Sequence, residues 1–144
     1  MSGISTDYDG SGIYVLLNTT KNKAYVGKSK HISERFREHR QNFKSKPEGF
    51  PMYDDDLSDF RFIVAMKLSE DEFSERGWLY EMLCMRECIL LHFDLYNQYP
   101  KGRKDIDWTI LSRLSHEMGV DSGISDSIRD ATGVLPILLT MKKP

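Results

Sequence analysis

The sequence predicts an α+β domain in which helices flank a small three-stranded antiparallel sheet, followed by a helical C-terminal extension. Two observations support this prediction. Short runs of β-branched and aromatic residues stand near the start of the chain, and apolar residues recur at helical spacing in longer segments further on. With 144 residues, of which 40% are hydrophobic, the chain is long enough for one domain that folds without disulfide bonds.

The first two predicted strands form a hairpin. The segment Gly12–Asn18 is rich in β-branched and aromatic side chains, and a turn-like stretch of Thr, Lys and Asn follows it. A second short strand is expected over Lys23–Gly27, with Gly27 ending it. Because Tyr14 and Tyr25 would stand on adjacent strands and can project toward the same side, we expect their two phenols to converge on one surface.

A modestly amphipathic, basic helix is predicted from His31 to about Phe43. Its narrow apolar edge consists of Ile32, Phe36, His39 and Phe43. The window from Lys21 to Lys46 holds nine Lys or Arg and two Glu, a net charge of +7, whereas the rest of the chain carries −9. Because charges are screened beyond about 8 Å at physiological salt, a polyanion would respond to this patch more than to the total of −2. Taken alone, such a run is more often a solvated helix face.

The middle of the chain is predicted to contain a long loop, a strand and the start of a second helix. The loop covers residues 44–59, and Phe60–Leu68 is the third strand. Ser69 and Glu72 have the spacing of a capping box, in which each side chain satisfies a backbone N–H of the first helical turn. A helix is therefore expected to begin near residue 70.

The main body of this second helix is expected over Trp78–Phe93. Its predicted apolar stripe consists of Leu79, Met82, Leu83, Ile89, Leu90 and Phe93, with Arg86 near the centre. Further helices are expected from Asp107 to about Met118 and from Ser125 to Thr132.

No part of the sequence has the character of a membrane segment or a secretory signal. No apolar run approaches the ~18 residues that would span a bilayer, and the amino terminus lacks a basic segment followed by an apolar core. We therefore expect an intracellular, cytoplasmic protein without a membrane partner. The two cysteines, Cys84 and Cys88, stand four residues apart within the predicted helix, so no disulfide is expected.

An ordered set of residues resembles the GIY-YIG nuclease superfamily. It comprises Gly12-Ile13-Tyr14, Tyr25-Val26-Gly27, Lys28 directly after that motif, Arg35, a Glu in a later helix, and Tyr96-Asn97. The resemblance covers about residues 11–97 and implies that this part is a nuclease domain. Residues 98–144 are then a helical extension, which we expect to pack on the same domain because the connection is short.

The resemblance implies a divalent-metal-dependent endonuclease that hydrolyses phosphodiester bonds, with DNA favoured over RNA and with Mg²⁺ or Mn²⁺ as the cofactor. The implied catalytic residues are Tyr14, Tyr25, Arg35, His39 and Glu87. The implied substrate-binding residues are Lys28, Lys30, Arg37, Arg40 and Asn97, and the motif glycines are Gly12 and Gly27. A homodimer is a possible arrangement, because an enzyme with one site must act twice to break a duplex.

The chemistry of these residue types agrees with the resemblance. A phenol titrates near ~10 in water, so it acts as a base at neutral pH only beside positive charge. Arg35 can donate two parallel hydrogen bonds to a phosphate, which Lys cannot. One carboxylate is enough to anchor Mg²⁺, which keeps several waters and leaves positions open for a phosphate.

Two glutamates are candidates for that carboxylate. On an ideal helix Glu87 lies about 100° from the centre of the predicted apolar stripe, whereas Glu81 lies about 140° from it. The sequence therefore favours Glu87 as the metal ligand, with Glu81 as the alternative.

Two other functions stay open at this point. The chain can be a nucleic-acid-binding module of the same fold that has lost catalysis, or a toxin-like nuclease that cleaves RNA. Each candidate residue also has a plain structural interpretation, such as a strand aromatic or a solvated helix residue. Their joint occurrence in the expected order favours the enzyme.

Overall fold

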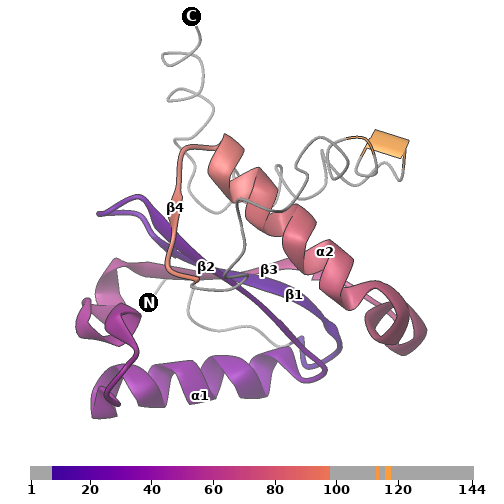
Figure 1. Ribbon diagram of the computed structural model, residues 1–144. Coiled ribbons are helices and arrows are strands. Elements are labelled where there is room, and N and C mark those ends of the chain that lie inside the picture. The colour runs from indigo at the N-terminus through magenta and orange to yellow at the C-terminus, as the bar shows by residue number, and fades with distance from the viewer. Residues whose placement is uncertain (1–7, 98–112, 114–115, 118–144) are drawn as a thin grey trace, which may run out of the picture.

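The computed structural model describes residues 8–97 together with Arg113, His116 and Glu117. Its centre is a four-stranded mixed sheet with the strand order β3-β1-β2-β4 (Figure 1). The strands are β1 (Gly12–Asn18), β2 (Lys23–Ser29), β3 (Phe60–Lys67) and β4 (Asp94–Leu95). The predicted α+β class with three main strands is confirmed. The short β4, which pairs parallel with β2, was not predicted, because a two-residue strand has no periodic signal in the sequence.

Strand β1 is the central strand and pairs antiparallel with both β2 and β3. All seven of its residues are buried, which agrees with the apolar run from Ile13 to Leu17, and the polar Asn18 at its end is buried as well. The prediction that Gly27 ends β2 was wrong, because Gly27 pairs with Tyr14 and the strand continues to Ser29. This glycine makes room for a neighbouring ring, as described below.

The two helices lie on opposite faces of the sheet, α1 (Ile32–Ser45) on one and α2 (Glu70–Leu90) on the other (Figure 1). Successive side chains of a strand point to opposite faces, so β1 contributes to two separate cores. Ile13 and Val15 pack in the core that contains α2, whereas Tyr14 packs in the core that contains α1.

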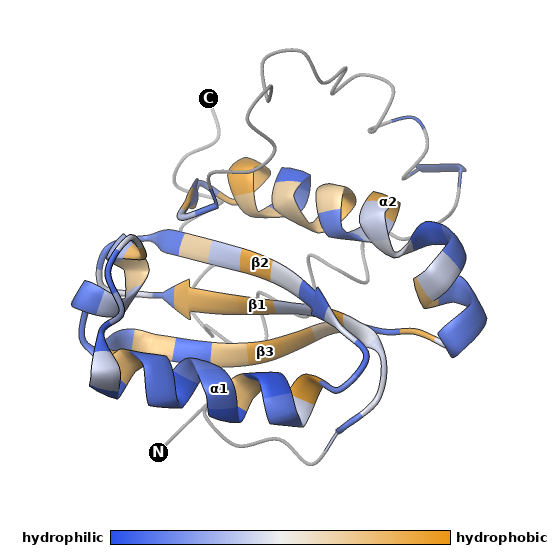
Figure 2. Ribbon diagram, turned by 60° about the horizontal axis from the view of Figure 1, so that its bottom comes forward, coloured by the Kyte–Doolittle hydropathy of each residue, from blue (hydrophilic) through white to orange (hydrophobic). Residues whose placement is uncertain are grey.

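Helix α1 has the predicted amphipathic character. Its buried residues are the four expected from the sequence, Ile32, Phe36, His39 and Phe43. The outward side of α1 is mostly hydrophilic (Figure 2). The sheet-facing edge of α1 therefore brings His39 against β1, while its charged residues stay accessible.

Helix α2 begins with the predicted capping box of Ser69 and Glu72. The predicted apolar stripe was wrong in part, because Leu90 is 53% exposed and Leu79, Met82 and Ile89 are only partly buried. The residues that α2 buries are Gly77, Tyr80, Leu83, Cys84, Met85, Glu87 and Cys88. Apolar residues occur on several sides of this helix, so periodicity alone did not identify the inward face. The helix also ends at Leu90, three residues before the predicted end.

The predicted loop between α1 and β3 contains two short 3₁₀ helices, η1 (Pro51–Asp54) and η2 (Leu57–Asp59). Met52 and Tyr53 of η1 are buried in the same core as α1, so this segment is part of the packed domain. Pro51 starts η1, where a proline costs no hydrogen bond.

The helices predicted after Asp107 and the proposed extension over residues 98–144 lie outside the described residues, apart from Arg113, His116 and Glu117. In the described part of the chain, no helix is long and apolar enough to cross a bilayer. Cys84 and Cys88 are buried and free, as predicted.

Candidate active site

Two phenols meet on the α1 face of the hairpin, as the sequence predicted. Tyr14 pairs with Gly27, and Leu16 pairs with Tyr25, so the two tyrosines are diagonal neighbours on one face. Their ring centroids lie 6.3 Å apart. Tyr14 is fully buried, whereas Tyr25 is only partly buried. Tyr25 is therefore the phenol that a ligand can reach.

The two motif glycines allow close packing at this place. A Cβ atom on Gly27 would lie 2.4 Å from Cζ and Oη of Tyr14, a separation that real atoms do not adopt. A Cβ atom on Gly12 would lie 2.1 Å from the carbonyl oxygen of Met66 on β3. Gly27 thus lets the ring of Tyr14 approach the backbone of the neighbouring strand, and Gly12 lets β1 approach β3.

His39 connects Tyr14 to a residue that the sequence did not indicate. Its Nε2 lies 2.8 Å from Oη of Tyr14, and its Nδ1 lies 2.9 Å from Oη of Tyr53 in η1. Asn42 donates a further hydrogen bond to Oη of Tyr53 at 3.1 Å. A neutral imidazole donates at one nitrogen and accepts at the other, so His39 couples the proton positions of the two phenols.

Burial fixes the protonation state of this group. Burial, and secondly the positive charge of Arg35, lower the pKa of His39 to about 4, so the imidazole is neutral at physiological pH. Burial also raises the pKa of Tyr14 and of Tyr25, and the positive charge of Arg35 opposes both increases. Further positive charge is therefore needed before Tyr25 can act as a base near neutral pH.

Arg35 stands one helical turn before His39 and is the exposed member of the group. Its Nε forms an ion pair with Oε1 of Glu38 at 2.9 Å, and 44% of its side chain is exposed. The positive charge of Arg35 opposes the increase in the pKa of Tyr14 that burial causes. The guanidinium thus lies at the boundary between the buried phenols and solvent, where a phosphate can reach it.

The further basic candidates lie on the surface. Lys30 and Arg37 are exposed, and Arg40 is partly buried. Lys28 lies on the α2 side of β2, where its Nζ is 5.7 Å from the centre of the Phe73 ring. Lys28 is therefore separated from Arg35 by the sheet, although both belong to the predicted site.

The two candidate glutamates differ in their surroundings. Burial raises the pKa of Glu81, and the positive charge of Lys28 opposes this increase. The pKa of Tyr25 is raised mainly by burial, and the negative charge of Glu81 adds to that increase. Glu81 thus lies within electrostatic range of both Tyr25 and Lys28. Glu87 is 5% exposed and forms an ion pair with Arg86. Because Glu81 and Glu87 are six residues apart in the helix, their side chains differ in direction by about 120° around its axis and lie on different sides of α2.

Asn97 holds the edge of β2 next to Tyr25. Its Oδ1 accepts a hydrogen bond from the backbone N–H of Val26 at 2.9 Å, and its Nδ2 donates to the carbonyl of the same residue at 2.8 Å. The side chain therefore continues the pairing that β4 begins. Tyr96 is fixed in turn, because its hydroxyl donates to Asp55 and accepts from Asn18.

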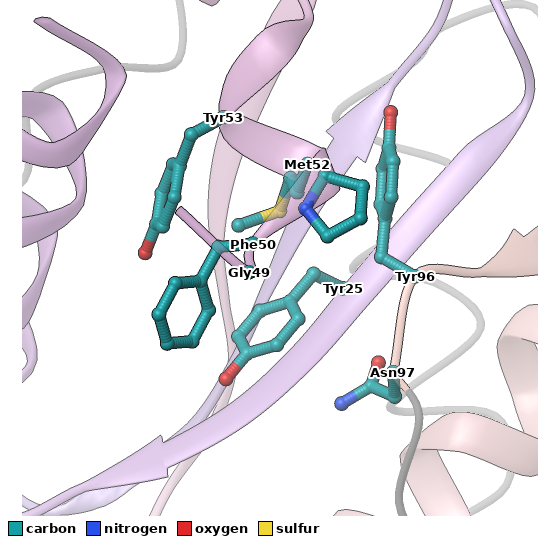
Figure 3. A pocket seen from close by; sticks show the side chains of 8 residues that line it. Tyr25, Gly49, Phe50, Met52, Tyr53, Tyr96 and Asn97 are labelled. Carbon is teal, nitrogen blue, oxygen red and sulfur yellow. The ribbon is translucent and has the colours of Figure 1, made fainter. Parts of the chain in front are cut away.

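A pocket of about 300 Å³ opens beside Tyr25. The described residues that line it are Tyr25, Gly49, Phe50, Pro51, Met52, Tyr53, Tyr96 and Asn97 (Figure 3). The sequence does not indicate this pocket, because residues 49–53 belong to a loop without a motif, and only folding places them near Tyr25.

A comparison with models of protein families finds the same resemblance in the sequence. Residues 10–73 match the model described as the GIY-YIG catalytic domain. This part of the chain is a GIY-YIG catalytic domain. The match spans β1, β2, α1 and β3, and thus includes the two motifs, Arg35 and His39. Searches of curated proteins and of solved structures found no match.

A GIY-YIG catalytic domain indicates an endonuclease, and hence a nuclease-type phosphodiesterase with a nucleic-acid substrate. GIY-YIG enzymes generally depend on a divalent metal ion. Among the described residues, no three His, Cys, Asp or Glu side chains come together as a metal site. A half-buried single carboxylate such as Glu81 fits a Mg²⁺ ion that keeps most of its waters, so the residues present are compatible with that cofactor.

Proposed function

We propose that this protein is a divalent-metal-dependent endonuclease that hydrolyses phosphodiester bonds in DNA. The observation that carries the proposal is the group formed by Tyr14, Tyr25, Arg35 and His39 on one face of the sheet. The guanidinium of Arg35 is the exposed cation of this group, and the exposed basic residues of α1 continue from it over the surface. Such a surface suits a phosphate backbone.

In the proposed mechanism, Arg35 holds the scissile phosphate and neutralises the charge that grows on its oxygens. Tyr25, ionised to the phenolate, accepts the proton of the attacking water at Oη, because it is the more accessible phenol. The water oxygen bonds to phosphorus as the bond to the 3′ oxygen breaks, and a solvent water protonates the leaving 3′ oxygen, so that the products are a 5′ phosphate and a 3′ hydroxyl. Tyr14 and His39 are buried, so they position Tyr25 and Arg35 without contacting the water.

We further propose Glu81 as the ligand of the metal ion, in preference to Glu87. The interactions of Glu81 with Tyr25 and Lys28 support this assignment, as does the burial of Glu87 in an ion pair. A bound divalent cation supplies positive charge that stabilises the leaving oxygen and favours ionisation of a nearby phenol. Asn97 acts by holding β2, and Lys30, Arg37 and Arg40 contact the backbone of the substrate.

Plasmid nicking tests the proposal. The protein is expected to convert supercoiled plasmid to open circles with Mg²⁺ or Mn²⁺ and to lose this activity in a chelator. Arg35→Ala should lower the rate by about 10²-fold to 10³-fold. Arg76→Ala, on the exposed side of α2, is the matched control and should keep the wild-type rate.

Two results would contradict the proposal. Full activity of Arg35→Ala would remove Arg35 from the mechanism. Salt-sensitive DNA binding without metal-dependent cleavage would favour the alternative of a non-catalytic binding module, and cleavage of matched RNA but not DNA would favour a ribonuclease.

A further inference from the structure

The pocket beside Tyr25 has aromatic walls, and of these only Tyr25 has a role in the proposed mechanism. Its side walls are the rings of Tyr25, Phe50, Tyr53 and Tyr96 (Figure 3). Phe50 is 58% exposed, an unusual degree for a phenylalanine, and its ring centroid lies 6.0 Å from that of Tyr53. The volume of about 300 Å³ equals that of about ten waters at ~30 Å³ each, which is more than one planar ring needs.

Apart from Oη of Tyr25, which the proposed mechanism uses, the polar side-chain atoms of the walls form hydrogen bonds within the protein. Oη of Tyr53 bonds to His39 and Asn42, and Oη of Tyr96 donates to Asp55. The amide of Asn97 bonds to the backbone of β2 at both its oxygen and its nitrogen. In Figure 3 the phenolic oxygens of Tyr25 and Tyr96 point in opposite directions. What the walls offer a ligand is therefore mainly the faces of their rings.

The surroundings of the pocket indicate which part of a nucleotide it suits. Asp55, which bonds to Tyr96 in the wall, forms an ion pair with Lys21 at 2.5 Å, and Nζ of Lys23 lies 4.8 Å from the centre of the Tyr96 ring. Charges of both signs therefore surround the pocket, and its aromatic lining is the feature that favours a planar, neutral ring. The exposed guanidinium of Arg35 acts on Tyr25 from the α1 side of the pocket, so a phosphate has a place outside it.

We propose that this pocket binds one unstacked nucleobase, from the nucleotide next to the phosphate that Arg35 holds, by stacking it on the rings of Phe50 and its neighbours. The proposal rests on the proposed function, since it assigns the base of the same substrate. Stacking on aromatic faces tolerates any base, so the pocket selects nucleic acid with an unpaired base at this position and not a particular sequence. Single strands and locally unpaired duplexes are then preferred, because an intact duplex must first release the base.

The test compares two single strands of equal charge, a short oligothymidylate and the matching strand without bases. Their affinities are measured by fluorescence anisotropy in a chelator, so that no cleavage occurs. The wild-type protein is expected to bind oligothymidylate about fivefold to about a hundredfold more tightly, the ratio that one stacked base provides. Phe50→Ala should bring this ratio close to one, and Phe50→Trp should keep it.

Trp78→Ala is the matched control, because Trp78 on α2 is 57% exposed against 58% for Phe50. Its ratio should equal that of the wild type. Equal affinity of the wild type for both strands would overturn the proposal, including the case in which the chain after Asn97 fills the pocket. A preference that Phe50→Ala leaves intact would overturn it as well.

Plasmid cleavage, measured in parallel, separates this proposal from the proposed function. Metal-dependent cleavage without a base preference would refute nucleobase binding in the pocket but would support the proposed endonuclease activity. A base preference that depends on Phe50, without cleavage under any metal, would refute the endonuclease activity but would support nucleobase binding in the pocket.

Discussion

At the residue scale, Tyr14 and Tyr25 are the same type of side chain, but they differ in burial and in contacts. Both phenols stand on one face of the hairpin, and burial raises the pKa of each. Tyr14 is fully buried and bonds to His39, so its position is fixed by the core. Tyr25 is partly exposed and lines the pocket. We therefore expect Tyr14 to support the site and Tyr25 to contact the substrate.

The two glutamates of α2 give the first prediction. Glu81→Gln should lower metal-dependent plasmid cleavage by about 10²-fold or more, since it removes the proposed anchor of the cation. Glu87→Gln should keep most activity but lower the free energy of unfolding by about 3 kcal/mol, because it removes the buried charge that faces Arg86. Nicking rates and urea denaturation of both variants check this, with Glu75→Gln as an exposed control. The reverse pattern of activity would assign the metal to Glu87.

The buried His39 gives a prediction about pH. Its pKa of about 4 in the folded protein lies below the ordinary value of 6.5, so between these values the unfolded chain binds a proton that the folded chain does not. The contribution of the neutral His39 to the free energy of unfolding is therefore complete above about pH 6.5 and is lost as the pH falls toward 4. Relative to His39→Gln, the wild-type protein should lose about 3 kcal/mol of unfolding free energy between pH 7 and pH 4. Urea denaturation at several pH values measures this difference, and a difference independent of pH would disprove it.

At the scale of elements, β2 is the strand on which the site depends. It is paired with β1 along its whole length, with β4 at its beginning, and with the side chain of Asn97 at Val26. These contacts hold Tyr25 against η1 on one face, while Lys28 reaches α2 on the other. The strand thus connects the two halves of the proposed site.

Two glycines in different elements are expected to respond oppositely to the same substitution. Gly27→Ala places a Cβ atom 2.4 Å from the ring of Tyr14, so it should cost about 1–3 kcal/mol of stability and displace Tyr14 from His39. Gly77→Ala lies inside α2, where the nearest atom would be an ordinary 3.7 Å away, and should stabilise by about 0.5–1 kcal/mol. Thermal unfolding and nicking rates of the pair check this. A neutral effect of Gly27→Ala would show that the strand can move to accept a side chain.

At the scale of the whole molecule, the sheet divides the domain into two cores, and charge is segregated in the same chain. The window of +7 contains β2 and α1, while the remainder carries −9. Exposed basic residues on α1 therefore act together with Arg35, and the acidic remainder does not cancel them at physiological salt.

This segregation predicts a salt-dependent affinity. When DNA binding is measured in a chelator, a plot of log Kd against the logarithm of the salt concentration should be a straight line with a positive slope. Arg37→Ala should reduce that slope by about one, because one phosphate contact is lost. Arg76→Ala should leave the slope unchanged. Anisotropy titrations at several salt concentrations give the slopes, and an affinity that does not respond to salt would exclude a phosphate-binding surface.

The hairpin, α1 and the capping box of α2 followed from local patterns in the sequence. The segment of β1 is apolar apart from its last residue, Asn18, and the four buried residues of α1 recur at helical spacing. The buried face of α2 did not follow, because apolar side chains such as Trp78 and Leu90 also occur on its outer side. Likewise, nothing local to Tyr53 indicates that it bonds to His39, fourteen residues away along the chain.

The sequence by itself determined which chemistry this protein can attempt, because the two motifs, Arg35 and the basic helix are contiguous patterns with a local physical cause. Only the tertiary structure showed that the charge of Glu81 contributes to the raised pKa of Tyr25, and that a loop without a motif supplies the aromatic walls beside this tyrosine. Those two features depend on the rotation of α2 and on the packing of η1 against α1. Both are set by contacts between distant segments, which no local pattern encodes.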